Sequence, residues 1–159
     1  MNILFLCTGN SCRSILAEAT FNALAPSGIK AMSAGSQPVG YVHPKSIALL
    51  SSKGIATEGY YSKSWDNLSV TPDIVITVCG NAAGETCPAY LGKVIRAHWG
   101  VEDPAKATGT DAEIDAAFEM AYSILRKRIE AFMKLPASLF EINNKAELQT
   151  QLNTIGEIK

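Results

Sequence analysis

The sequence has no excess of charge of either sign, because 14 Lys and Arg residues stand against 15 Asp and Glu residues among 159. A formal net charge of -1 gives no overall field that would draw the chain to nucleic acid or to an anionic membrane surface. Charged residues are also scarce, at 18%, which argues against a disordered chain, and the 47% of hydrophobic residues can form a core without crosslinks. We therefore expect no nucleic-acid partner, and any bound anion must be held by a local site.

Long hydrophobic runs are lacking as well. The apolar run near the start of the sequence, Ile3 to Cys7, is far shorter than the ~20 residues of a membrane-spanning helix or the ~7–15 residues of a signal-peptide core. We expect no membrane partner and a cytoplasmic location, where structural disulfides are rare. The four cysteines are then thiols, open to catalysis, redox cycling, metal binding or core packing: Cys7, Cys12, Cys79 and Cys87.

The sequence also lacks the usual motifs for metals and nucleotides. The cysteine spacings C-x4-C and C-x7-C do not follow the short paired spacings of zinc sites, and neither a G-x-G-x-x-G motif nor a Walker lysine is present. His43, beside Pro44 at a predicted helix start, and His98, at a predicted strand end, are expected to be structural. We therefore expect no bound metal and no bound cofactor.

Strands and helices alternate along the chain, which predicts a single α/β domain with an open parallel four-stranded sheet flanked by helices. Predicted strands cover residues 2–6, 29–34, 73–78 and 94–98, and predicted helices cover 14–25, 44–53 and 111–135. The last helix carries an apolar stripe interpreted as core packing: Phe118, Tyr122, Leu125 and Ile129. We expect the domain to span 1–136. An extension of unknown role, 137–159, would add one weak helix or fray.

A short polar loop between the first strand and the first helix has the features of an oxyanion site. The start of a helix offers unpaired N–H groups and the positive end of its dipole, and Arg13 adds a planar fork of donors. The same donors would face Cys7 at the base of the loop and favour its nucleophilic thiolate. The alternative is a helix-capping loop with a buried cysteine and a surface arginine. The expected oxyanion-binding residues are Thr8, Gly9, Asn10, Ser11, Cys12, Arg13 and Ser14, with the Cys12 side chain a buried filler.

With other motifs, this loop resembles the low-molecular-weight tyrosine phosphatase superfamily and, within it, the thioredoxin-coupled arsenate reductases. The matching motifs are Cys7 to Ser14, Ser33-Ala34-Gly35, His43-Pro44, Val75 to Cys79 and Trp99-Gly100-x-x-Asp103-Pro104. The resemblance implies Cys7 as nucleophile, Arg13 as oxyanion ligand and Asp103 as general acid. It also implies Asn10 and Ser14 as organisers of the loop. Without the resemblance, Asp103 would be taken for an ordinary turn residue before proline.

The other cysteines bear on the choice between reductase and phosphatase. Reduction of arsenate to arsenite needs two electrons, which a dithiol supplies when it becomes a disulfide. Cys79 ends the third predicted strand at the same sheet edge as Cys7, and Cys87 follows eight residues later. The alternative is that both are packing residues without a redox role. The resemblance implies that Cys79 attacks Cys7, that Cys87 attacks Cys79, and that thioredoxin reduces the resulting disulfide; glutaredoxin or glutathione remains open as the reductant.

The sequence departs from the family pattern after the Asp103-Pro104 pair and at Lys63. Phosphatases of this superfamily usually carry aromatic residues after the Asp-Pro pair, whereas Ala105 and Lys106 stand here, so we expect an arsenate reductase with residual phosphatase activity. A tyrosine phosphatase using Cys7, Arg13 and Asp103 is the alternative function. Lys63 stands about where some relatives have an acidic residue that helps to bind a potassium ion, and its ammonium could occupy the cation's place beside Glu18.

Overall fold

The computed structural model describes residues 1–78 and 94–159. Its sheet consists of β1 (Asn2–Cys7), β2 (Lys30–Gly35), β3 (Ile74–Thr77) and β4 (Ile95–His98), all parallel, in the order β2-β1-β3-β4. The predicted four-stranded parallel sheet is therefore confirmed. The first strand in the sequence lies in the middle of this sheet, and its residues Ile3 to Leu6 are fully buried. A strand covered on both faces explains the unbroken apolar run.

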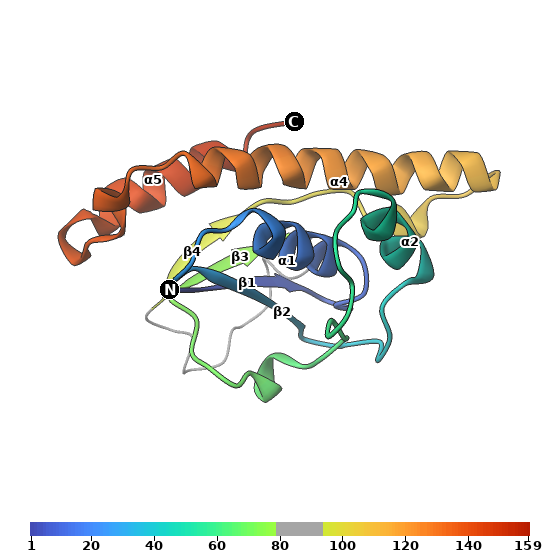
Figure 1. Ribbon diagram of the computed structural model, residues 1–159, viewed down its shortest axis with the longest axis horizontal. Helices are drawn as coiled ribbons and strands as arrows, with labels where there is room; N and C mark the ends of the chain where they lie inside the picture. Colours follow the sequence, from blue (N-terminus) through green and yellow to red (C-terminus); the bar gives the residue numbers. More distant parts are fainter. Residues whose placement is uncertain (79–93) are drawn as a thin grey trace.

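Helices cover one face of the sheet in two tiers (Figure 1). The first helix, α1 (Arg13–Leu24), packs on β1 and β2, while the long α4 (Asp111–Met133) lies across α1 and α2 (Pro44–Ser52). The N-terminus of α4 is closed by a capping box between Thr110 and Glu113. The apolar stripe predicted for this helix is buried, with Leu125 and Ile129 inaccessible to solvent.

The remaining helical segments are short, apart from the one near the end of the chain. Single 3-10 turns are η1 (Trp65–Asn67), η3 (Pro104–Lys106), η4 (Ala137–Phe140) and η5 (Ile142–Asn144). They are followed by α5 (Lys145–Ile155), which lies beside β4 (Figure 1). Leu148, Leu152 and Ile155 of α5 are buried in the same core as the sheet. The extension after residue 136 is thus helical and packs against the domain.

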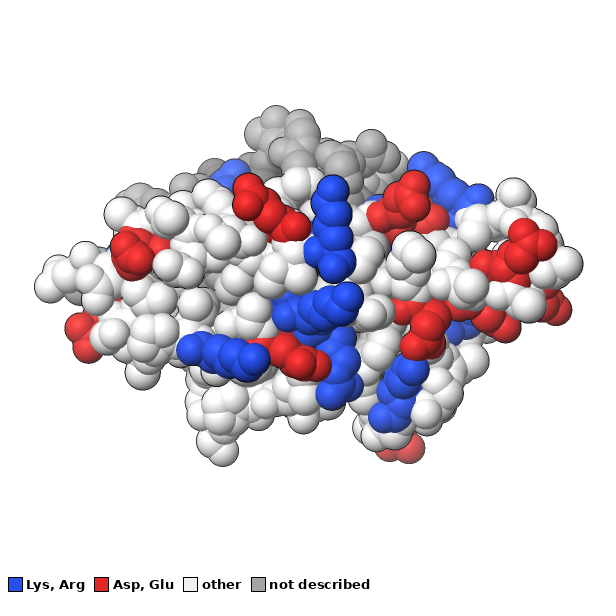
Figure 2. Space-filling view, turned by 90° about the horizontal axis from the view of Figure 1, so that it is seen from above, with Lys and Arg blue, Asp and Glu red and all other residues white. Residues whose placement is uncertain are grey.

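The surface over α4 carries charges of both signs, with several basic side chains near the middle of the view and acidic ones around them (Figure 2). Three exposed ion pairs contribute to this pattern: Lys45–Asp115, Lys53–Glu119 and Arg126–Glu130. Exposed pairs of this kind stabilise a fold by about 0–1 kcal/mol each, so they do not hold the helices in place. Within residues 1–78 and 94–159, no helix is both long and apolar enough to cross a membrane.

Candidate active site

Cys7 ends β1 at the carboxyl edge of the sheet, where the chain curls through residues 8–12 into α1. Its side chain is buried, with 3% of the residue exposed. The Asn10 backbone N–H donates to Cys7 Sγ at 3.3 Å, and the Ser14 hydroxyl donates to it at 3.5 Å. Donors that converge on a sulfur at the start of a helix stabilise its negative charge. The arrangement suits a thiolate nucleophile.

Asn10 holds the loop in its curled shape. Its φ of 48° lies in the left-handed region, which asparagine tolerates better than most residues. The buried side-chain amide donates to the Ser14 hydroxyl at 2.8 Å and to the Ser33 hydroxyl at 2.9 Å, and its oxygen accepts from the Lys63 backbone N–H at 2.9 Å. Asn10 thereby ties the loop to α1, to β2 and to the segment around Lys63.

A buried carboxyl group lies behind this network. Ser33 donates to Glu18 Oε1 at 2.5 Å, and burial raises the pKa of Glu18, while the positive charge of Lys63 partly offsets that rise. Burial in turn lowers the pKa of Lys63, and the charge of Glu18 opposes that change. Among the ion pairs of the described residues there is none between Glu18 and Lys63; the ammonium donates to the Tyr61 carbonyl at 3.1 Å. The two groups act on each other through space, and replacement of a potassium ion by Lys63 stays a prediction.

Arg13, the first residue of α1, joins the loop to the segment after β4. Its Nη1 donates to the Val101 carbonyl at 2.9 Å, and its Nη2 lies 3.3 Å from Asp103 Oδ2. The third nitrogen of the fork, Nε, is buried and has no hydrogen-bond partner among the described residues. A buried unpaired donor costs free energy, so this group is suited to a ligand oxygen.

Asp103 reaches the site from the opposite side. It caps η3, with its Oδ1 accepting from the Ala105 backbone N–H at 3.0 Å, and its other oxygen faces Arg13. A cavity of about 160 Å³ lies between these groups, and Cys7, Arg13 and Asp103 all line it. Sequence reasoning placed these three residues in one site, and the structure brings them together around one small cavity.

The outer wall of the cavity comes from a segment that sequence reasoning did not assign to the site. Val39 and Tyr41, both exposed, line the cavity together with His43. Three backbone hydrogen bonds fix this segment on the loop: Gln37 to Thr8, Val39 to Gly9 and His43 to Ser11. In the sequence, the signal was two apolar residues, Val39 and Tyr41, in a short segment between prolines. Only the folded chain shows that this segment contacts the loop at Cys7.

Residues 2–148 match the family described as low molecular weight phosphotyrosine protein phosphatase. The chain belongs to this family. A curated arsenate reductase of Halalkalibacterium halodurans is 40% identical over 131 residues, which cover 82% of this chain and 93% of that protein. The arsenate reductase of Bacillus subtilis is 37% identical over the same shares.

Solved structures of family members have the same fold. An arsenate reductase in the phosphate binding state superposes with a TM-score of 0.69 at 29% identity, over 83% of this chain and 95% of that one. The thioredoxin-dependent arsenate reductase of Corynebacterium glutamicum gives a TM-score of 0.58 at 27% identity, over 81% of this chain and 61% of that one. The first of these relatives is described with an oxyanion bound, and the loop of this chain has the donors to hold one.

Of the other residues singled out in the sequence, Cys12 and His43 line the cavity, whereas His98 does not. Cys12 lines the cavity, but its burial raises the pKa of the thiol to about 11, so it is protonated at neutral pH. His43 caps α2 by accepting from the Lys45 backbone N–H at 3.1 Å, and its ring lies 5.0 Å from that of Phe118. His98 lies outside the cavity lining, with Nδ1 2.7 Å from the Thr77 hydroxyl.

The two remaining cysteines, Cys79 and Cys87, lie outside the described residues. The residue after β3 lies beside the end of β1, because the Val78 backbone N–H donates to the Leu6 carbonyl at 2.9 Å. Within the described ranges, no three His, Cys, Asp or Glu side chains come together in a way that could hold a metal ion.

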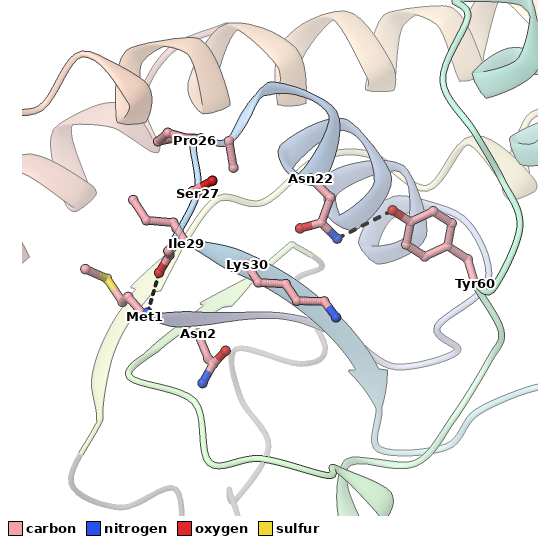
Figure 3. A pocket seen from close by; sticks show the side chains of 10 residues that line it. Met1, Asn2, Asn22, Pro26, Ser27, Ile29, Lys30 and Tyr60 are labelled. Atoms are coloured by element: carbon pink, nitrogen blue, oxygen red, sulfur yellow. Dashed lines mark hydrogen bonds between the residues drawn. The ribbon is translucent and has the colours of Figure 1, made fainter.

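A larger hollow of about 660 Å³ lies at the opposite edge of the sheet, around the start of β1 and β2 (Figure 3). Asn22 and Tyr60 point toward one another in it, with 3.4 Å between the amide nitrogen and the hydroxyl. Met1 and Gly28 also line this hollow, and the Met1 ammonium donates to the Gly28 carbonyl at 2.7 Å. The lining includes no cysteine, histidine or acidic residue, so the smaller cavity at Cys7 remains the candidate active site.

Proposed function

We propose that this protein is an arsenate reductase that converts arsenate to arsenite with Cys7 as the nucleophile. The observation that carries the proposal is the cavity at the end of β1. Cys7 and Arg13 both line this cavity of about 160 Å³, and the buried Nε of Arg13 has no hydrogen-bond partner among the described residues. Such a site suits a small tetrahedral oxyanion. The named arsenate reductases that match most of the chain support the same conclusion.

In the proposed first step, the Cys7 thiolate attacks arsenic, and one arsenic–oxygen bond breaks. The Asp103 carboxyl group gives its proton to the departing oxygen, which leaves as water. The backbone N–H groups of residues 8–14 and the guanidinium of Arg13 stabilise the negative charge on the remaining oxygens. The product of this step is an arsenic(V) adduct on Cys7.

In the proposed second step, the thiolate of Cys79 attacks the sulfur of Cys7. The sulfur–arsenic bond breaks and its electron pair stays with arsenic, which leaves as arsenite while a Cys7–Cys79 disulfide forms. Two thiols thus supply the two electrons that reduce arsenic(V) to arsenic(III). Cys87 then attacks Cys79, which frees Cys7 and moves the disulfide to the Cys79–Cys87 pair.

An external dithiol must reduce this last disulfide, and we propose thioredoxin. The thioredoxin dependence named for the Corynebacterium glutamicum structure supports this choice over glutaredoxin or glutathione. A thiol relay of this kind requires a reducing compartment, which supports the cytoplasm as its location.

A weak phosphatase activity is the second candidate. It needs only Cys7, Arg13 and Asp103, and one observation favours it: Tyr41 lines the cavity with its side chain exposed, so an aryl group could pack against it. This aromatic residue comes from the segment before α2 and not from the segment after Asp103.

The test offers arsenate and phenyl phosphate separately to the enzyme with thioredoxin, thioredoxin reductase and NADPH. We expect NADPH oxidation with arsenate and, at most, slow phenol release from the phosphate ester. A second arm replaces the thioredoxin system with glutathione, glutaredoxin and glutathione reductase. NADPH oxidation in that arm alone would show that glutaredoxin, and not thioredoxin, is the partner.

Two variants serve as controls. Cys7→Ser should abolish both activities, whereas Cys79→Ser should abolish the reduction of arsenate and leave phenol release intact. Phenol release without arsenate-driven oxidation in the native enzyme would make the protein a phosphatase. Arsenate reduction that persists in Cys79→Ser would contradict the relay.

A further inference from the structure

The described residues include a buried guanidinium without an acidic partner. Arg128 of α4 is only 4% exposed, and none of the ion pairs within residues 1–78 and 94–159 includes it. Burial lowers the pKa of Arg128 from its ordinary value, yet a guanidinium stays protonated at neutral pH. A buried charge is costly unless hydrogen bonds compensate it, so its partners show what it holds in place.

The hydrogen bonds of Arg128 go to backbone carbonyls of two segments that are far apart in sequence. Its Nη1 donates to the carbonyls of Trp99 at 2.8 Å and Gly100 at 3.2 Å, directly after β4. Its Nε donates to the Ile158 carbonyl at 2.9 Å, beyond α5. A planar guanidinium with donors in fixed directions therefore joins the end of β4 to the C-terminal extension.

The segment of residues 99–103 is fixed at several further points. The indole of Trp99 donates to the Leu152 carbonyl of α5 at 3.0 Å, and the Trp99 backbone N–H donates to the Thr77 carbonyl at 2.7 Å. Directly after the two carbonyls that Arg128 holds, the segment enters the active site. There the Val101 carbonyl accepts from Arg13, and Asp103 pairs with the same guanidinium.

We propose that Arg128 is a positioning residue that fixes the 99–103 segment and thereby places the Asp103 carboxyl group over the Cys7 cavity. The C-terminal extension takes part, because it supplies the carbonyls of Leu152 and Ile158. This inference rests on the proposed function, in which Asp103 is the general acid. A proton donor must lie within hydrogen-bond reach of the departing oxygen, so a small displacement of the segment lowers the rate.

The experiment is a double-mutant cycle on kcat/KM for arsenate. Arg128→Lys keeps the charge but loses the fork, and it is made in the native background and in Asp103→Asn. The matched control is Arg126→Lys, on the same helix, whose exposed guanidinium bonds to Glu130 and Tyr122. We expect Arg128→Lys to lower kcat/KM by about fivefold or more in the native background and by less than about twofold with Asn at position 103. Arg126→Lys should cost less than about twofold in both.

An equal loss from Arg128→Lys in the two backgrounds, or no loss in either, would overturn the inference. Amide exchange of residues 99–103 without substrate tests, apart from activity, whether Arg128 fixes this segment. Faster exchange in Arg128→Lys than in Arg126→Lys supports this role, and equal exchange refutes it. A native enzyme that reduces no arsenate would refute the proposed function alone, since the exchange result would still stand. Should Arg128→Lys not fold, Trp99→Phe, which removes the bond to Leu152, must show the same dependence on Asp103.

Discussion

The Nη1 and Nη2 atoms of Arg13 bond within the protein, whereas its buried Nε has no hydrogen-bond partner among the described residues. A lysine at this position would keep the charge but could not bond to Val101, Asp103 and an oxyanion together. We predict that Arg13→Lys lowers kcat/KM for arsenate at least about tenfold, a loss of about 1.4 kcal/mol of transition-state stabilisation. Steady-state kinetics beside the Arg126→Lys control measure this, and a loss below about threefold would remove Arg13 from its proposed role.

Glu18 makes stability depend on pH. Burial raises its pKa above the ordinary value of 4.5, so the folded chain binds this proton more tightly than the unfolded chain does. The contribution is complete below pH 4.5 and is lost as pH rises through the raised pKa. In Glu18→Gln an amide oxygen can still accept from Ser33 but nothing titrates. We predict that the free energy of unfolding falls less from pH 4.5 to about pH 7 in Glu18→Gln than in the native protein. Urea unfolding at each pH measures the two slopes, and equal slopes would contradict the prediction.

At the scale of elements, the sequence predicted the sheet and the main helices with ends shifted by only one or two residues. The strand expected at 73–78 is β3, Ile74–Thr77, and the helix expected at 111–135 is α4, Asp111–Met133. Buried elements carry their own periodic or continuous apolar pattern, so they can be found locally. The helix α5 also had such a pattern, with Leu148, Leu152 and Ile155 at steps of four and three, but polar neighbours weakened it.

The candidate site was only partly predictable for a related reason. Cys7, Arg13 and the loop between them are close in sequence, and the start of a helix dictates their chemistry. The wall formed by Val39 and Tyr41 depends instead on hydrogen bonds to Thr8 and Gly9, about 30 residues away in the sequence. The hydrogen bonds of Arg128 go to backbone carbonyl groups. Every residue has such a group, so no sequence pattern predicts which ones Arg128 binds.

The packing of α5 is itself open to test. Leu152 is fully buried between α5 and the sheet, so its truncation leaves a cavity in the core. We predict that Leu152→Ala lowers the free energy of unfolding by about 2–5 kcal/mol. Urea unfolding measures the change, and Met120→Ala, at an exposed position of α4, should change it by less than about 0.5 kcal/mol. A loss of similar small size at Leu152 would show that α5 is not part of the core.

For the molecule as a whole, the shared core predicts one cooperative unfolding transition. Trp99 lies where β4, α5 and β1 meet, since it packs 6.0 Å from Phe5 and bonds to Leu152. In a Trp65→Phe variant Trp99 is the only tryptophan left, so its fluorescence reports on this junction. We predict that fluorescence and far-UV circular dichroism give the same urea midpoint. A fluorescence transition at lower urea would mean that the extension separates from the domain first.

The position of α5 beside β4 has a consequence for how the chain is made. Translation proceeds from the N-terminus, so β4 leaves the ribosome about 50 residues before the helix that covers it. The Gln149 side chain of α5 bonds to the Arg96 carbonyl of this strand, at the edge of the described sheet, and this contact cannot form until α5 has been made. An open strand edge on a nascent chain invites pairing with neighbouring chains. Stalled or prematurely terminated products of this protein should therefore be a main source of its aggregates, and the natural clients of chaperones at the ribosome.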